Sequence, residues 1–233
     1  VDSSENAELS GILDALGFAR IGHHPRKAVE YYAQGGINIV VNLEPQSFAQ
    51  QFHADHGPSV CAIGLRVADD TAAARRCELL NYSVSAPGPD ADHGMRSVET
   101  TGGSLLYLAN AKEMPGIWNR EFKATGRIVD SAFLKSVDHI AFTMTYEEML
   151  SATLLYRSVF GMLSTTPTVI ADQGGLVKSQ VMQTSDQAVC FALNSSQAEG
   201  TLSNRVMRQY AGTGVQHIAF SCSDIFALAS AMS

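Results

Sequence analysis

Hydrophobic and polar residues alternate through three short segments that resemble one another. The segments are SVCAIGLRV (residues 59–67), SVDHIAFTM (136–144) and GVQHIAFSC (214–222). Side chains of a β-strand point to opposite faces in turn, so the alternation predicts three half-buried strands. Each segment is followed by a polar step with acidic residues and then by a helical pattern, an order that suits the positive N-terminal end of a helix dipole. The repeats therefore predict a strand and then a helix, three times.

Further strand-like runs fill the chain between these repeats. Three such runs follow each earlier helical pattern, and turn sequences such as QGG, TGG and DQGG separate them. The pattern predicts an α+β fold of paired βαβββ modules in two domains. We expect a first domain over 1–111 without metal ligands, a linker over 112–130 and a second domain over 131–233. On this interpretation both domains are incomplete at the chain ends, which exposes strand edges and favours aggregation of the isolated chain.

Composition narrows the class of protein. The chain has 233 residues, is 45% hydrophobic and 17% charged, and carries a formal net charge of −7, which argues against nucleic acid as a partner. No apolar run is long enough for a membrane span, so no membrane partner is expected. The four cysteines are scattered and form no C-x-x-C pair, which favours free thiols in a reducing cytoplasm.

Two histidines occupy equivalent positions in the repeats. His139 and His217 align with Ala62 of the first copy, so their side chains should face the same way. A single histidine on an apolar strand is usually a hydrogen-bonded core residue. Two at equivalent positions favour a shared metal ion, which neutral imidazole binds readily. We interpret the remaining five histidines as surface or turn residues: His23, His24, His53, His56 and His93.

At these motifs the sequence resembles the vicinal-oxygen-chelate superfamily, and within it the 4-hydroxyphenylpyruvate dioxygenase-like branch. The similar stretches are YYAQGGINIVVNLEP, HGPSVCAIGLRVAD, GGSLLYL, VDHIAF and GVQHIAFSCSDIF. The resemblance implies paired βαβββ modules and a mononuclear Fe(II) held by two histidines and a glutamate in the second domain. It assigns His139 and His217 as ligands and places the glutamate beyond Ser233. Mg, Mn or Co are alternatives to Fe(II), and the implied small-molecule partner is a 2-oxo acid or related carboxylate.

Within that branch, GLVKSQVMQ followed by FALNSS looks more like the C-terminal half of bacterial two-domain 3-dehydroshikimate dehydratases. In such fusions a TIM barrel, which performs the dehydration, precedes the dioxygenase-like half. A true dioxygenase usually shows Asn-Glu-Pro near Asn194, where this chain has Asn-Ser-Ser. Asn194 and Ser179 are candidate substrate-binding residues. A structural turn, as for the repeat partner Asn42, and an ordinary strand position are the competing interpretations.

Three functions remain open at this point. The first is the dioxygenase-like half of a dehydratase (lyase) of quinate and shikimate catabolism. The second is a free-standing Fe(II) 2-oxo-acid dioxygenase of tyrosine catabolism. The third is a non-catalytic structural or dimerisation module. We expect the chain to be part of an enzyme, inactive alone, and able to form a homo-oligomer.

Overall fold

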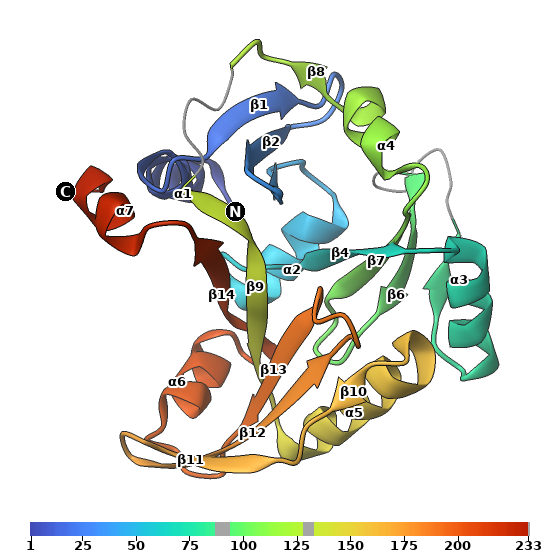
Figure 1. Cartoon of the computed structure of the whole chain (residues 1–233), viewed down its shortest axis with the longest axis vertical. Coiled ribbons are helices and arrows are strands. Elements are labelled where there is room, and N and C mark those ends of the chain that lie inside the picture. The colour runs from blue at the N-terminus through green and yellow to red at the C-terminus, as the bar shows by residue number, and fades with distance from the viewer. Residues whose placement is uncertain (87–93, 128–132, 233) are drawn as a thin grey trace. The chain divides into compact units, whose positions relative to one another are not determined.

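The computed structural model describes residues 1–86, 94–127 and 133–232 (Figure 1). These residues form two compact units. The first comprises Val1–Pro58, Gly116–Asp138 and Ala219–Ser233, and the second comprises Ser59–Pro115 and His139–Ile218. The domain limits that we expect from the repeats, at 111 and 131, stay a prediction.

The first unit contains a four-stranded sheet in the order β3-β2-β1-β8. Neighbouring strands in it are antiparallel. The helix and three strands expected near the N-terminus are present. Their bounds are α1 (Ser3–Ala15), β1 (Ala19–His23), β2 (Val29–Gln34) and β3 (Ile37–Asn42), and α2 (Phe48–His56) follows.

The segment expected as a linker has its own secondary structure. It contains α4 (Met114–Glu121) and the short strand β8 (Lys123–Ala124), which pairs with β1. Proline and glycine interrupt the periodicity here, which is why the helix was not predicted; Pro115 lies in its first turn, where a missing backbone N–H does no harm. Residues 128–130 of the expected linker lie outside the described residues.

Two βαβββ modules build the second unit. In the first of them the sheet order is β4-β7-β6-β5, with β4 and β7 parallel and the other pairs antiparallel. Its elements are β4 (Ala62–Val67), α3 (Asp70–Leu79), β5 (Val84–Ser85), β6 (Arg96–Glu99) and β7 (Leu105–Asn110). The predicted order of strand, helix and three strands is therefore confirmed.

The next module repeats this connectivity in the order β10-β12-β13-β9-β14, with β9 and β13 parallel. The strand-like run LSTTPTVIA (residues 163–171) is divided into β10 and β11, and both pair with β12. Its elements are β9 (Leu134–Thr143), α5 (Tyr146–Phe160), β10 (Leu163–Ser164), β11 (Thr168–Asp172), β12 (Gly175–Gln183) and β13 (Cys190–Ser195). The module is followed by α6 (Leu202–Gln209), β14 (Gly214–Cys222), which adds to the sheet beside β9, and α7 (Ile225–Ala231). The outer ends of β9 and β14, and α7, belong to the first unit.

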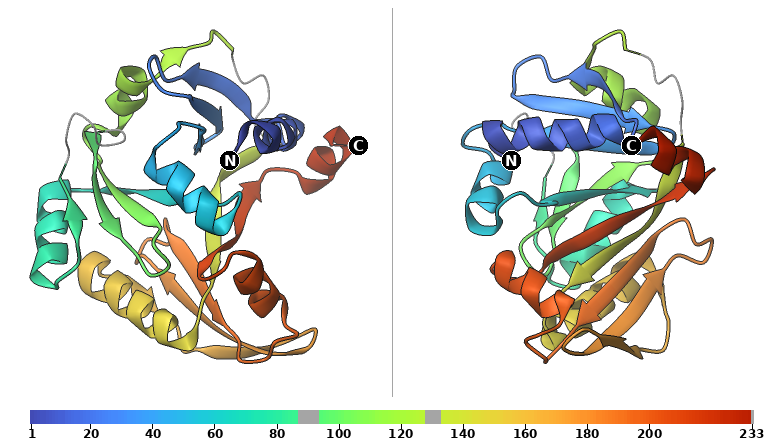
Figure 2. Two further views of the ribbon diagram at one scale, coloured as in Figure 1. Left: turned by 180° about the vertical axis from the view of Figure 1, so that it is seen from behind. Right: turned by 90° about the vertical axis from the view of Figure 1, so that its left-hand side faces the viewer.

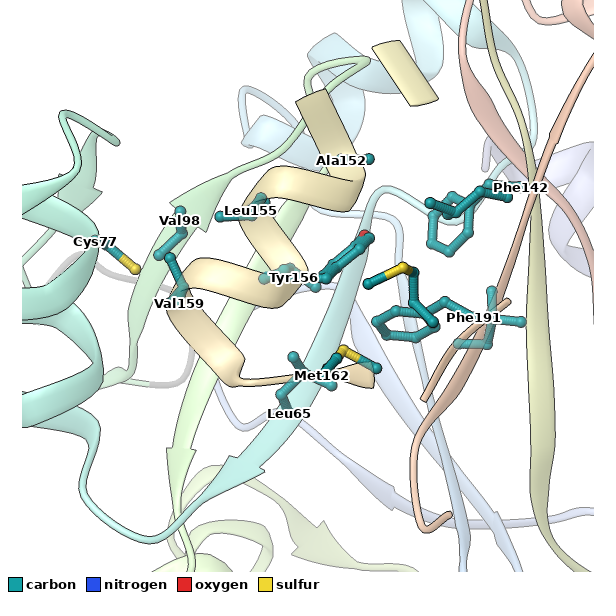
Figure 3. Close-up of a cluster of buried hydrophobic side chains, with 14 of the residues drawn as sticks. Leu65, Cys77, Val98, Phe142, Ala152, Leu155, Tyr156, Val159, Met162 and Phe191 are labelled. Carbon is teal, nitrogen blue, oxygen red and sulfur yellow. The ribbon is translucent and has the colours of Figure 1, made fainter. Parts of the chain in front are cut away.

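Helix α5 organises the core of the second unit. It contacts α3, β10 and β13, and it runs beside the orange strands in Figure 2. Figure 3 shows Leu155 and Val159 on one side of α5 towards Cys77 of α3, and Tyr156 near Phe191 of β13. Cys77 is fully buried, and burial raises the pKa of its thiol. None of the four cysteines, all of which are described residues, forms a disulfide, as expected.

The start of α5 is held by a carboxylate. Thr145 and Glu148 form a capping box, in which the Thr145 hydroxyl accepts from the Glu148 amide and the Glu148 carboxylate accepts from the Thr145 amide. The same carboxylate oxygen accepts a 2.6 Å hydrogen bond from Thr213. Burial raises the pKa of Glu148, but the hydrogen bonds from Thr213 and Thr145 outweigh it, so the pKa is lowered overall.

A buried glutamine at the end of β2 connects the end of helix α1 with the start of β9 in the first unit. Gln34 has no exposed surface; its Nε2 donates to the Leu16 carbonyl at 3.0 Å and its Oε1 accepts from the Leu134 amide at 2.8 Å. Gly17, with a φ of 86°, leaves space for the Gln34 side chain, because a Cβ there would lie 2.5 Å from Gln34 Nε2.

Within the described residues, none of the helices has the length and apolar character needed to cross a bilayer.

We expect Gln34→Met to lower the free energy of unfolding by roughly 2–4 kcal/mol, because two buried backbone groups lose their partner. Methionine matches glutamine closely in length, so little volume changes. Denaturant unfolding monitored by circular dichroism measures the effect. Gln51→Met, at an exposed position of α2, is the control and should change stability little. Equal loss in both variants would contradict the role given to Gln34.

We expect Glu148→Gln to lower the free energy of unfolding by about 1 kcal/mol at neutral pH, since a charged cap and its bond to Thr213 are weakened. Because the folded-state pKa of Glu148 is lowered, its stabilisation is present above the ordinary value of 4.5 and is lost as the pH falls through the folded-state pKa. Denaturant unfolding of both proteins across this range should show their difference shrinking in acid. The exposed neighbour Glu147→Gln is the matched control. A difference independent of pH would refute the argument.

Candidate metal centre

His139 and His217 lie on adjacent strands of the six-stranded sheet. His139 is on β9 and His217 is on β14, and these two strands are hydrogen-bonded neighbours. The two Nε2 atoms are 3.4 Å apart, the ring centroids 5.5 Å apart, and the ring planes are inclined at 79°. Both histidines belong to the second unit. The structure therefore brings together the two side chains that the repeats single out.

Strand alternation explains where His139 points. Ile140 and Phe142, its neighbours along β9, pack into the core that α5 covers. Phe142 meets Phe191 of β13 with ring centroids 5.6 Å apart. His139, one residue before Ile140, consequently faces the opposite side of the sheet. It is half-buried there, and His217 is exposed.

The spacing of the two rings fits a shared metal ion. Two imidazole nitrogens that bind one ion at about 2.1 Å lie roughly 3.0 Å apart when the bonds are at a right angle, and roughly 3.4 Å apart at a tetrahedral angle. The observed Nε2–Nε2 distance of 3.4 Å reaches the upper of these values without any movement. The same distance also permits one ring to donate a hydrogen bond to the other, which is the purely structural interpretation.

The electrostatics favour the form of imidazole that binds metals. Burial lowers the pKa of His217, and repulsion from His139 lowers it further. A lower pKa keeps the ring neutral at neutral pH, and a neutral ring nitrogen has a free lone pair. Residues 1–86, 94–127 and 133–232 contain no group of three or more His, Cys, Asp or Glu side chains placed to hold a metal ion. The glutamate expected beyond Ser233 stays a prediction.

Ser179 and Asn194 face each other across β12 and β13. By alternation they lie on the same face of the sheet as His139. However, Asn194 is paired with Thr143, four residues beyond His139 on β9, which is about 13 Å along the strand. Ser179 is buried, with 8% of its surface exposed. The structure thus places both residues on the same face of the sheet as His139 but away from the histidine pair, and their role in binding substrate stays a prediction.

Asn42 and Asn194 differ in what their side chains do, although they are repeat partners. Asn42 Oδ1 accepts a 2.9 Å hydrogen bond from the Glu44 amide, which shapes the turn after β3. At Asn194 the contact is made by the main chain, whose carbonyl accepts from the Met144 amide at 3.0 Å. The structural interpretation therefore describes Asn42, and the role of Asn194 stays a prediction.

Sequence reasoning overlooked two residues that lie beside the histidines. Phe191 of β13 is paired with Ile140 of β9, so the preceding residues of these parallel strands, Cys190 and His139, lie next to each other. Across β12 and β13, Cys190 is paired with Gln183. Because neighbours across a sheet share a face, Gln183, Cys190 and His139 form a row that β14 extends to His217. Alternation gave each side chain a face, but only the parallel pairing of β9 and β13 makes them neighbours.

Three of the other histidines make contacts of a structural kind, and a fourth is exposed. His53 Nε2 lies 2.6 Å from Glu5 Oε2, and His56 packs on Phe52 with ring centroids 4.2 Å apart. His24 Nδ1 accepts from the Lys27 amide, and His23 is exposed. His93 lies outside the described residues.

Comparison with known proteins agrees with this architecture. The family described as hydroxyphenylpyruvate dioxygenase, N-terminal, matches residues 2–123. A 3-dehydroshikimate dehydratase of Pseudomonas putida is 35% identical over 97% of this chain, and one of Pseudomonas aeruginosa is 37% identical over 97%. A 4-hydroxyphenylpyruvate dioxygenase of a Pseudomonas species is 30% identical over 93% of this chain and 62% of its own length. The chain spans 36% of the length of the two dehydratases.

Solved structures give the same result. A xylose isomerase-like TIM barrel/4-hydroxyphenylpyruvate dioxygenase fusion protein superposes on all of this chain with a TM-score of 0.84 and 33% identity, over 36% of its own length. A 4-hydroxymandelate synthase variant from Streptomyces coelicolor has a TM-score of 0.79 at 20% identity, and the match covers 97% of this chain and 71% of the synthase. At this level of identity the similarity is evidence for a shared fold only. This chain therefore belongs to the hydroxyphenylpyruvate dioxygenase family and has the vicinal-oxygen-chelate fold.

Proposed function

We propose that this chain is the dioxygenase-like region of a two-domain 3-dehydroshikimate dehydratase. In this proposal His139 and His217 bind a divalent metal ion, for which Fe(II) is the first candidate and Mg, Mn or Co are alternatives. The observation that carries the metal site is the 3.4 Å separation of the two Nε2 atoms. The glutamate expected beyond Ser233 completes the ligand set of the proposal.

The dehydratase assignment is supported by similarity that extends over nearly the whole of this chain. Two proteins named 3-dehydroshikimate dehydratase match 97% of this chain, and a barrel–dioxygenase fusion protein matches all of it. Each is matched over 36% of its own length, as expected if a further domain accompanies this region. Dehydration then belongs to the barrel, and this region supplies a second, metal-dependent site.

The residues around the histidines suit a small chelating ligand. A bound divalent ion would supply Lewis acidity and a template for a 2-oxo acid or related carboxylate. His139 and His217 provide neutral nitrogen donors on one side of the ion. Ala141 and Ala192, paired across β9 and β13, place small side chains on the same face as His139. Gln183 places an amide in the row that leads to His139, where it can donate to a ligand oxygen.

A free-standing dioxygenase of tyrosine catabolism is the second candidate. It is favoured by the 30% identity to a 4-hydroxyphenylpyruvate dioxygenase over 93% of this chain. The sequence Asn-Ser-Ser at 194–196, where dioxygenases carry Asn-Glu-Pro, argues against it. A third candidate, a structural or dimerisation module, requires that the histidines bind no metal.

We expect His139→Ala and His217→Ala each to weaken binding of Co(II), used as a stable probe ion, by at least about tenfold. Loss of a residue that only hydrogen-bonds to a metal ligand already weakens metal binding by about this factor, and loss of the ligand itself should cost at least as much. Isothermal titration calorimetry of the full chain measures the affinity. His23→Ala removes an exposed histidine and is the control. Equal affinity in all four proteins would exclude the site and leave the structural module.

We expect the protein that contains this region in its complete reading frame to dehydrate 3-dehydroshikimate and to consume no oxygen with 4-hydroxyphenylpyruvate. Product absorbance and an oxygen electrode measure the two reactions on one preparation. Oxygen uptake without dehydration would select the dioxygenase instead. If neither reaction occurs, the dehydratase assignment fails even where the metal site is present.

A further inference from the structure

A pocket lies in the second unit, on the face of β12 and β13 that points away from the side of the histidines. It has a volume of about 480 Å³, within the usual range for small-molecule sites. Its lining includes Tyr146, Val169, Leu176, Lys178, Ser195 and Ala198. None of these residues has a part in the proposed metal site.

The register of three strands aligns the lining residues. Val169 of β11 is paired with Lys178 of β12, and Lys178 is paired with Ser195 of β13. Met182, four residues after Lys178 on β12, is in the core that α5 covers, so Lys178 points to the α5 side of the sheet. Val169, Lys178 and Ser195 therefore lie in one row on this face, beside the start of α5, where Tyr146 is the first residue.

Lys178 brings a positive charge into this pocket. Its Nζ donates to the Tyr146 hydroxyl at 3.1 Å and lies 4.2 Å from the centre of the Tyr146 ring. This contact uses one of three ammonium donors and leaves the Tyr146 hydroxyl proton available. Among the ion pairs between described residues, none includes Lys178. The ammonium is thus held in place and available to an anion.

Ser195 adds a hydroxyl beside it. Ser195 lines the pocket, and 4% of its surface is exposed. Its hydroxyl can donate a hydrogen bond to a ligand oxygen there. Val169, Leu176 and Ala198 form an apolar wall, and Val169 and Leu176 are 64% and 61% exposed.

We propose that this pocket binds a small organic monocarboxylate with a compact apolar or aromatic body. The Lys178 ammonium neutralises the carboxylate, the hydroxyls of Tyr146 and Ser195 donate to its oxygens, and the apolar wall covers its body. One cation matches one negative charge, whereas a phosphate dianion would keep an uncompensated charge, and phosphate sites commonly use an Arg fork or several backbone amides. The site is separate from the metal centre and does not depend on it.

Benzoate is the test ligand, and isothermal titration calorimetry on the full chain measures its affinity. We expect Lys178→Met to weaken benzoate binding by about tenfold or more, because the variant loses one charge-assisted hydrogen bond to the carboxylate. Lys112→Met, at an exposed lysine, is the matched control and should bind as wild type does. Benzamide, which has the same ring without the charge, and inorganic phosphate should bind at least about tenfold more weakly than benzoate.

A second pair of variants keeps the test independent of charge. Val169→Trp fills the pocket and should abolish benzoate binding. Ile170→Trp places the same ring one residue along β11, on the other face, and should leave binding intact; both positions are exposed, so the fold should tolerate either change. Thermal unfolding of each variant checks this.

The proposal is overturned if benzoate does not bind, if benzamide or phosphate binds as well as benzoate, or if Lys178→Met and Val169→Trp bind as wild type does. Loss of binding in His217→Ala with no loss in Val169→Trp would place the ligand at the histidines, and would also overturn it. Because Co(II) binding is measured separately, failure of this pocket is distinguishable from failure of the metal site.

Discussion

The alternation of side chains along β9 is the constraint on which both faces of the six-stranded sheet depend. This strand lies between β13 and β14, and every second residue points to the same side. Ile140 and Phe142 enter the core beneath α5 because that face is covered. His139 must then point away from the core. A slip of one residue would bury the imidazole and expose the two hydrophobic side chains, so the core and the histidine pair specify the same register.

This division allows one module to carry chemistry that another lacks. The module that begins at β4 has the same strand order and the same parallel closing pair as the module that begins at β9. Its equivalent of His139 is Ala62, on the face that the core does not use. An imidazole can therefore be present or absent at this position without a change in how the module packs. The fold supports the site but does not require it.

The two faces of β12 and β13 have different chemical characters. Towards the histidines they present Gln183, Cys190 and small side chains, which suit a ligand held by a metal ion. Towards α5 most of the surface is core, but beside the start of the helix the sheet lines a pocket. Lys178 and Ser195 lie there, so a cation and a hydroxyl occur together at the edge of a hydrophobic face.

Local sequence determined the elements and the faces of their side chains. Period-two alternation identified the strands, capping residues such as Thr145 and Glu148 mark the start of α5, and the repeat singled out His139 and His217 as equivalent. The repeat did not reveal α4 or the pairing of β8 with β1, because a short helix that begins with proline has no clear periodicity. It also gave no distance between any two strands.

Tertiary structure alone decided which side chains became neighbours. The 3.4 Å approach of the two imidazoles requires β14 to lie against β9, and the row from Gln183 to His139 requires β13 to lie parallel to it. Both pairings join segments far apart in the chain, and their register is set by packing over the whole sheet. Alternation specifies direction within a strand, whereas proximity between strands depends on long-range contacts that no local pattern contains.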